Sequence, residues 1–174
     1  MLKIIAIVIG VFAAGVLLLA ATRPDHFRVQ RQVVVKAPAE KILPLITDLR
    51  GWSAWSPYEK KDPAMKRTFG GAERGKGATY AWDGNKEVGA GSMEITDVTS
   101  AQVKINLAFL KPMEAHNVAT FALEPRGDST IVEWAMDGPQ PFLGRVVCLF
   151  LNMDKLVGTD FEAGLASLKV LAEK

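Results

Sequence analysis

The sequence is poor in the residues that most catalytic and metal sites require. Among its 174 residues there is one cysteine, Cys148, and there are two histidines, His26 and His116. A single cysteine excludes an internal disulfide and a thiolate metal cluster. The sequence also lacks HExxH, a nucleophile elbow, GxGxxG and a phosphate-binding loop. We therefore expect no metal, no cofactor and no set of catalytic residues.

A surplus of positive charge is missing too. From residue 23 onward the chain carries all of its Lys and Arg except Lys3, which leaves 20 against 19 Asp and Glu, and no basic run. A nucleic-acid-binding protein normally carries a basic patch or stripe. The composition therefore predicts no nucleic-acid partner.

One long hydrophobic run stands at the start of the chain. Residues 4–22 contain no charge and lie between Lys3 and Arg23. As a helix the run would be about 28 Å long, close to the ~30 Å core of a bilayer. A cleaved signal peptide is the alternative, but its apolar stretch is normally about 7–15 residues long. We expect an anchor over residues 1–23, a folded domain over residues 24–174, and a single pass through the cell membrane.

Two properties of the anchor stay open. Arg23, Arg28 and Arg31 follow the run and favour a cytoplasmic domain, but long domains can cross the membrane regardless of such charges. The side of the membrane is therefore unknown. Ala6, Gly10 and Ala14 share one helix face, which allows close helix contact and a weak homodimer through the anchor. Chance spacing is the alternative.

The rest of the chain predicts an α+β domain. Alternating apolar residues predict a strand over 27–37 and six more strands between 65 and 138, separated by Gly, Pro, Asp and Asn. Short turns between the strands indicate antiparallel pairing. Helical spacing predicts a short helix over 37–49, interrupted or kinked near Pro44, and a helical segment from Pro141 to Lys174.

The C-terminal segment leaves its own alternatives. It is either one kinked helix or two helices that meet at Gly158. Its first part, residues 142–153, is more apolar than one buried stripe requires. That part either covers a cavity or touches the bilayer beside the anchor.

The segments "VVVKAPAEKILPLITDLRGWSAWSPYE", "FLKPMEAHNVATFALEP" and "MDKLVGTDFEAGLASLK" carry a family resemblance. They resemble the SRPBCC superfamily of START-like and polyketide cyclase-like proteins, and in particular its membrane-anchored polyketide cyclase/dehydrase-like subgroup. The resemblance covers about residues 27–173. It implies a helix-grip fold, in which a curved antiparallel sheet wraps around a long C-terminal helix and leaves an apolar cavity.

Trp52 and Trp55 lie close together between the first helix and the sheet, in a segment broken by Gly51 and Pro57. They either contact a ligand at the mouth of the cavity or act as core plugs, that is, side chains that only fill the hydrophobic core. Strand alternation places further side chains on the cavity face. The predicted cavity residues are Trp52, Trp55, Tyr80, Trp82, Met93, Phe109, Asn117, Phe121, Trp134, Met136 and Met153.

Polar side chains on this face would orient a ligand or bond to each other. Asn117 and Tyr80 are the candidates, whereas His116 shares the opposite face with Glu114 and Thr120. We therefore predict binding of a hydrophobic small molecule or lipid rather than catalysis. The alternatives are a cyclase/dehydratase-like enzyme, with Tyr80, Asn117 and Asp137 steering an intermediate, or an interaction module without a ligand.

Overall fold

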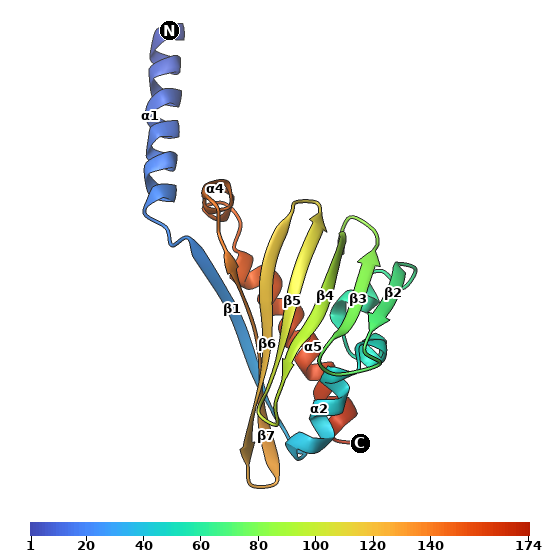
Figure 1. Cartoon of the computed structure of the whole chain (residues 1–174). Helices are drawn as coiled ribbons and strands as arrows, with labels where there is room; N and C mark the ends of the chain where they lie inside the picture. Colours follow the sequence, from blue (N-terminus) through green and yellow to red (C-terminus); the bar gives the residue numbers. More distant parts are fainter.

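One curved antiparallel sheet dominates the computed structural model, which describes all 174 residues except the side chains of Leu2 and Ala6. The seven strands lie in the order β1-β7-β6-β5-β4-β3-β2 (Figure 1). β1 therefore pairs with the last strand of the chain, and the other neighbours are joined by hairpins. The strands are β1 (His26–Val35), β2 (Lys66–Gly71), β3 (Ala78–Asp83), β4 (Ala90–Val98), β5 (Gln102–Lys111), β6 (Ala115–Arg126) and β7 (Ser129–Pro139).

Helices cover the concave side of this sheet. The long helix α5 (Met153–Ala172) crosses it and contacts β1 and β7. Between β1 and β2 the chain forms α2 (Ala39–Thr47), the 3-10 helix η1 (Leu49–Ala54) and α3 (Pro57–Lys61), which contact α5, β3 and β6. The fold is the helix-grip fold that the sequence predicted.

Strand alternation explains where the core lies. Inward residues such as Ile105, Phe121 and Val132 are fully buried, and so are Phe161 and Leu165 of α5. The intervening residues of the strands point outward, as the period of two requires. The sheet and α5 thus each bury one apolar face against the other.

The C-terminal segment breaks at a different place from the one predicted. It forms α4 (Phe142–Cys148) and α5, and the break is at residues 149–152, where Asn152 caps α5 by accepting from the Lys155 backbone N–H at 2.9 Å. Gly158 lies inside α5, where a Cβ would overlap the guanidinium of Arg31. Arg31 donates from Nε to Glu162 at 2.6 Å and from Nη1 to Asp154 at 3.0 Å. Gly158 therefore leaves room for the Arg31 side chain of β1 to lie against α5, and it does not end a helix.

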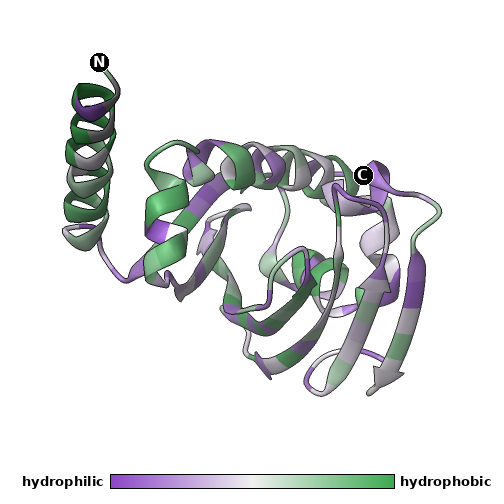
Figure 2. Cartoon of the chain, turned by 90° about the horizontal axis from the view of Figure 1, so that it is seen from above, coloured by the Kyte–Doolittle hydropathy of each residue, from purple (hydrophilic) through white to green (hydrophobic). Residues whose placement is uncertain are grey.

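Two apolar helices lie outside this core. Helix α1 (Leu2–Ala21) projects from the domain, and α4 lies beside its base (Figure 1). Both are coloured as hydrophobic in Figure 2, which views the domain from above. Lys3–Ala21 is long and apolar enough to cross a membrane, and nearly all of it is exposed. The predicted small-residue face of α1 includes Ala6, whose side chain lies outside the described residues.

Candidate ligand-binding face

Trp52 of η1 and Trp55, which directly follows η1, bind carbonyl groups at the C-terminal end of α2. The last carbonyls of a helix have no partner within that helix. Here the indole of Trp52 donates to the Ile46 carbonyl at 2.9 Å, and that of Trp55 donates to the Leu45 carbonyl at 3.0 Å. Each indole thereby finds a partner in the buried interior, and the rings are fixed against the concave face.

Aromatic rings fill the space between η1, the sheet and α5. Trp52 and Trp55 contact one another with ring centroids 4.9 Å apart, and both meet Phe121 edge-on. Trp134 stacks on Phe121 at 4.9 Å and on Phe161 of α5 at 4.1 Å. Trp55 is 0% exposed. This packing favours the core-plug alternative for Trp52 and Trp55, and ligand contact by them stays a prediction.

The concave face becomes less buried toward the end of the sheet that carries α4. The row formed by Ile95, Ile105 and Ala119 is buried. In the next row, Met93 and Asn117 are buried but Leu107 between them is half-buried. The outermost row is half-buried except for its small glycine and consists of Trp82, Gly91, Phe109 and Ala115. The least covered part of the predicted ligand face is therefore this outer row.

Gly91 makes room for the ring of Trp82. The two residues are register partners, and a Cβ at position 91 would lie 2.6 Å from the Trp82 ring. Trp82 contacts Phe109 edge-on at 5.8 Å and donates to the Val88 carbonyl at 3.1 Å. The absence of a side chain at Gly91 thus permits the contact between Trp82 and Phe109 in the outer row.

A buried polar network joins β3 to α3 and β2. The hydroxyl of Tyr80 donates to Oε1 of Glu59 at 2.6 Å, and Nε of Arg67 donates to Oε2 at 2.7 Å. Glu59 is 7% exposed. Glu59 and Arg67 were not predicted as functional residues, because nothing in the sequence of the short α3 distinguishes a buried carboxylate from a surface one. With its hydroxyl bonded to Glu59, Tyr80 already has the partner that a ligand would have supplied.

In the folded protein, both tyrosine hydroxyls should remain protonated at pH values well above the ordinary pKa of tyrosine. Burial, followed by the hydrogen bond to Glu59, raises the pKa of Tyr80, and burial with nearby Asp160 raises the pKa of Tyr58. These are the only two tyrosines. Above about pH 10 the unfolded chain ionises its tyrosines and the folded one does not, so stability should fall as the pH rises. An absorbance titration should show tyrosinate only as the domain unfolds; ionisation of either residue near pH 10 in the folded protein would contradict this.

Asn117 and Trp134 carry buried polar atoms without partners. Nδ2 of Asn117 makes only a long contact, 3.8 Å, with Sδ of Met136. Oδ1 of Asn117 and Nε1 of Trp134 have no hydrogen-bond partner among the described residues. A Cβ at Gly138 would overlap the Asn117 amide, so this glycine allows the side chain to lie across β7. An unpaired buried polar atom costs about 1–3 kcal/mol, which a ligand group could recover.

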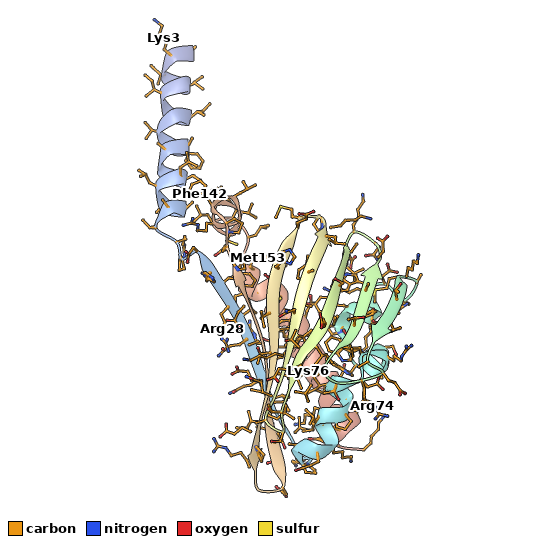
Figure 3. All side chains as sticks on the ribbon, in the orientation of Figure 1. Lys3, Arg28, Arg74, Lys76, Phe142 and Met153 are labelled. Carbon is orange, nitrogen blue, oxygen red and sulfur yellow. The ribbon has the colours of Figure 1, made fainter. Side chains whose placement is uncertain are left out.

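Three residues lie away from this face. Met153, a predicted cavity residue, begins α5 and is 39% exposed, outside the aromatic core (Figure 3). His116 is exposed, as its strand parity indicated. Asp137 lies on the outer face and accepts from Arg28 at 2.8 Å. The trio proposed for an enzymatic role, Tyr80, Asn117 and Asp137, therefore does not converge.

Two hollows lie at the edges of the molecule. One of about 230 Å³ lies beside the edge strand β2 and is lined by residues including Arg50, Phe69 and Thr79. Another of about 130 Å³ lies between the end of α1 and α4. Neither is lined by a predicted cavity residue, and both are smaller than the ~300–1,000 Å³ of typical ligand pockets.

Solved structures with the same architecture are numerous but distant in sequence. The dimeric Aha1 from Colwellia psychrerythraea is 18% identical, with a TM-score of 0.59, and the match covers 84% of this chain and 96% of that one. A protein from Nitrosospira multiformis is 19% identical, with a TM-score of 0.59 and coverage of 83% and 94%. At such identities the likeness concerns the fold alone.

A biosynthetic protein shares the fold as well. BexL, a di-domain ARO/CYC protein from the BE-7585A biosynthetic pathway, is 14% identical with a TM-score of 0.63. The match covers 90% of this chain and 53% of BexL. No curated protein matches the chain.

One family model matches nearly the whole folded domain. It describes polyketide cyclases, dehydrases and lipid transport, and it aligns with residues 26–173. The matched segment begins where α1 and its linker end and runs through α5. The chain belongs to the family described as polyketide cyclase / dehydrase and lipid transport.

Proposed function

We propose that this protein binds a hydrophobic small molecule or lipid at the outer, half-buried part of the concave face, while α1 anchors it in a membrane. The observation that carries the proposal is the buried Oδ1 of Asn117, which has no partner among the described residues. Apolar residues lie beside Asn117: Leu107 is its register partner, and Sδ of Met136 is 3.8 Å from its amide nitrogen. One polar group on an apolar face is the arrangement that orients an amphipathic ligand.

The position of this face supports the part of the proposal in which α1 anchors the protein in a membrane. Its less buried end is the end of the sheet beside α4 and α1 (Figure 1). An apolar molecule that dissolves in the bilayer would reach this end without crossing bulk water. The family description names lipid transport beside cyclase and dehydrase activity, and the separation of Asp137 from Tyr80 weighs against the enzymatic alternative.

Native mass spectrometry of the full chain tests the proposal. We expect a co-purified hydrophobic molecule, and we expect Asn117→Ala to reduce the bound fraction about tenfold, the effect of one lost hydrogen bond. With the bound molecule removed from both proteins, the melting temperature should be unchanged or higher, because the variant removes an unpaired buried oxygen. The measured mass also reports whether residues 1–23 remain attached.

Asn106→Ala is the matched control, since Asn106 is exposed on the opposite face of the neighbouring strand β5. It should leave the bound fraction unchanged. An absence of bound molecules in the wild type would favour the alternative of an interaction module with a filled core. A mature chain that begins near Arg23 would rule out the anchor.

A further inference from the structure

Helix α4 is an apolar helix without a buried residue. Its seven residues include Phe142, Leu143 and Val147, yet none of the seven is buried. Leu143 is 65% exposed, and Phe150, just after the helix, is 67% exposed. Isolated exposed apolar residues are normal, but a contiguous patch of them marks an interaction surface. The packing of this domain therefore does not explain why residues 142–151 are apolar.

The place of α4 indicates what covers it. Arg145 donates from Nη1 to the carbonyl of Arg23 at 3.2 Å, so α4 is tied to the chain just beyond α1. The 20 residues of α1 span about 30 Å, which matches the hydrocarbon core of a bilayer. With α1 across the membrane, its last residues lie at the polar boundary, and α4 lies beside them. Figure 3 shows Phe142 next to the lower end of α1.

The positively charged side chains beside α4 are of the kind found at the polar boundary of a bilayer. The hollow of about 130 Å³ is lined by Arg23, Pro24, His26, Gln140, Arg145 and Cys148. Nε of Arg145 is buried there without a hydrogen-bond partner, and neither arginine forms an ion pair with any described carboxylate. The nearby Asp25 is already bonded to His26 at 3.0 Å, which contributes most to lowering its pKa, with a smaller effect from Arg145. Two arginines with unused donors can bind a phosphate oxygen.

We propose that residues 142–151 form a membrane-docking surface, in which Leu143 and Phe150 enter the acyl boundary while Arg23 and Arg145 bind the phosphate of a phospholipid headgroup. An interfacial helix combines these features: an apolar face directed at the acyl chains and basic side chains at headgroup level. The inference rests on the anchor and is independent of the ligand at Asn117. Docking would hold the outer row of Trp82 and Phe109 on the membrane side of the domain.

Hydrogen exchange of the full chain in lipid nanodiscs tests the docking surface. In wild type the backbone amides of residues 142–151 should exchange at least about tenfold more slowly than in Leu143→Asp/Phe150→Asp. Val170→Asp is the matched control, because Val170 is equally exposed, at 60%, but lies near the other end of α5. Equal exchange in the wild type and the double variant would overturn the docking surface.

The lipid composition tests the arginines. Adding phosphatidylglycerol to phosphatidylcholine discs should increase the protection of residues 142–151, and Arg23→Gln/Arg145→Gln should abolish that increase while the exposed Arg74→Gln leaves it intact. An unchanged increase in the double variant would refute headgroup binding. Loss of protection on adding inorganic phosphate would assign the hollow to free phosphate instead of lipid.

A readout that does not depend on helix stability completes the test. A fluorophore on Leu143→Cys, in a Cys148→Ser background, should be quenched by lipids that are spin-labelled near the headgroup. A fluorophore on Val170→Cys should not be quenched. Equal quenching at both positions would contradict docking through α4. Intact mass separates these results from loss of α1, which would instead remove the anchor.

Discussion

Trp55→Ala is expected to lower the free energy of unfolding by about 3–5 kcal/mol, the usual cost of truncating a fully buried large aromatic residue. Trp55 is 0% exposed and packs against Trp52, Phe121 and Trp134. Its replacement would empty the centre of the aromatic cluster and leave the carbonyl of Leu45 without a donor. Denaturant unfolding of the full chain, followed by circular dichroism, measures the loss.

Trp55→Phe serves as the comparison, because it keeps a ring in the core and loses the indole hydrogen bond. It should cost clearly less than alanine. If Trp55→Ala unfolded as the wild type does while losing its bound molecule, Trp55 would be a ligand-contacting lid and not a core plug. The fully buried ring leads us to expect the opposite pattern.

Arg67→Met is expected to destabilise the domain by about 3–5 kcal/mol, because it leaves a buried carboxylate without its counter-charge. The carboxylate of Glu59 accepts from both Arg67 and Tyr80, and its side chain is only 6% exposed. Methionine has a similar length to the arginine stem and preserves much of its packing. The loss should therefore report the broken pair, together with the hydrogen bonds from Arg67 to nearby backbone carbonyls, rather than a cavity.

The double variant Glu59→Gln/Arg67→Met separates charge from packing. Removing both charges should restore much of the stability, since an uncharged amide still accepts from the hydroxyl of Tyr80. Lys111→Met provides a matched control at the exposed ion pair with Asp83, where a change of less than about 1 kcal/mol is expected. An effect of Arg67→Met as small as that of Lys111→Met would show that the buried network contributes little.

Much of the fold could be predicted from strand alternation. Strand alternation placed Met93, Phe121 and Trp134 on the cavity face, and all three are buried. His116 was assigned to the other face, and it is exposed. Alternation predicts these placements because a strand must turn successive side chains to opposite sides. The predicted cavity residues on strands are all buried or half-buried, whereas Met153 of α5 is exposed; Trp52 and Trp55 are buried but do not lie on strands.

The error at Gly158 has a physical reason. A glycine followed by "TDFE" is typical of a helix end and a new helix start. The residue that requires a glycine here is Arg31, which is more than 120 positions away in the chain. Likewise, Gly138 is required by the amide of Asn117 on the neighbouring strand. Local sequence gives no sign of a side chain that arrives from another element.

Local patterns in the sequence were enough to predict the strands, the antiparallel hairpins between successive strands, the faces of the strands and the apolar length of the first helix, because each depends on residues close together in the chain. Which concave residues pack as core and which remain half-buried in the outer row became known only from the three-dimensional packing. It alone paired Glu59 with Arg67 and Tyr80, left the Oδ1 of Asn117 unpaired, and placed α4 beside α1 with no buried residue. These features depend on how far α5 and η1 extend over the sheet, and that extent follows from the simultaneous packing of distant side chains.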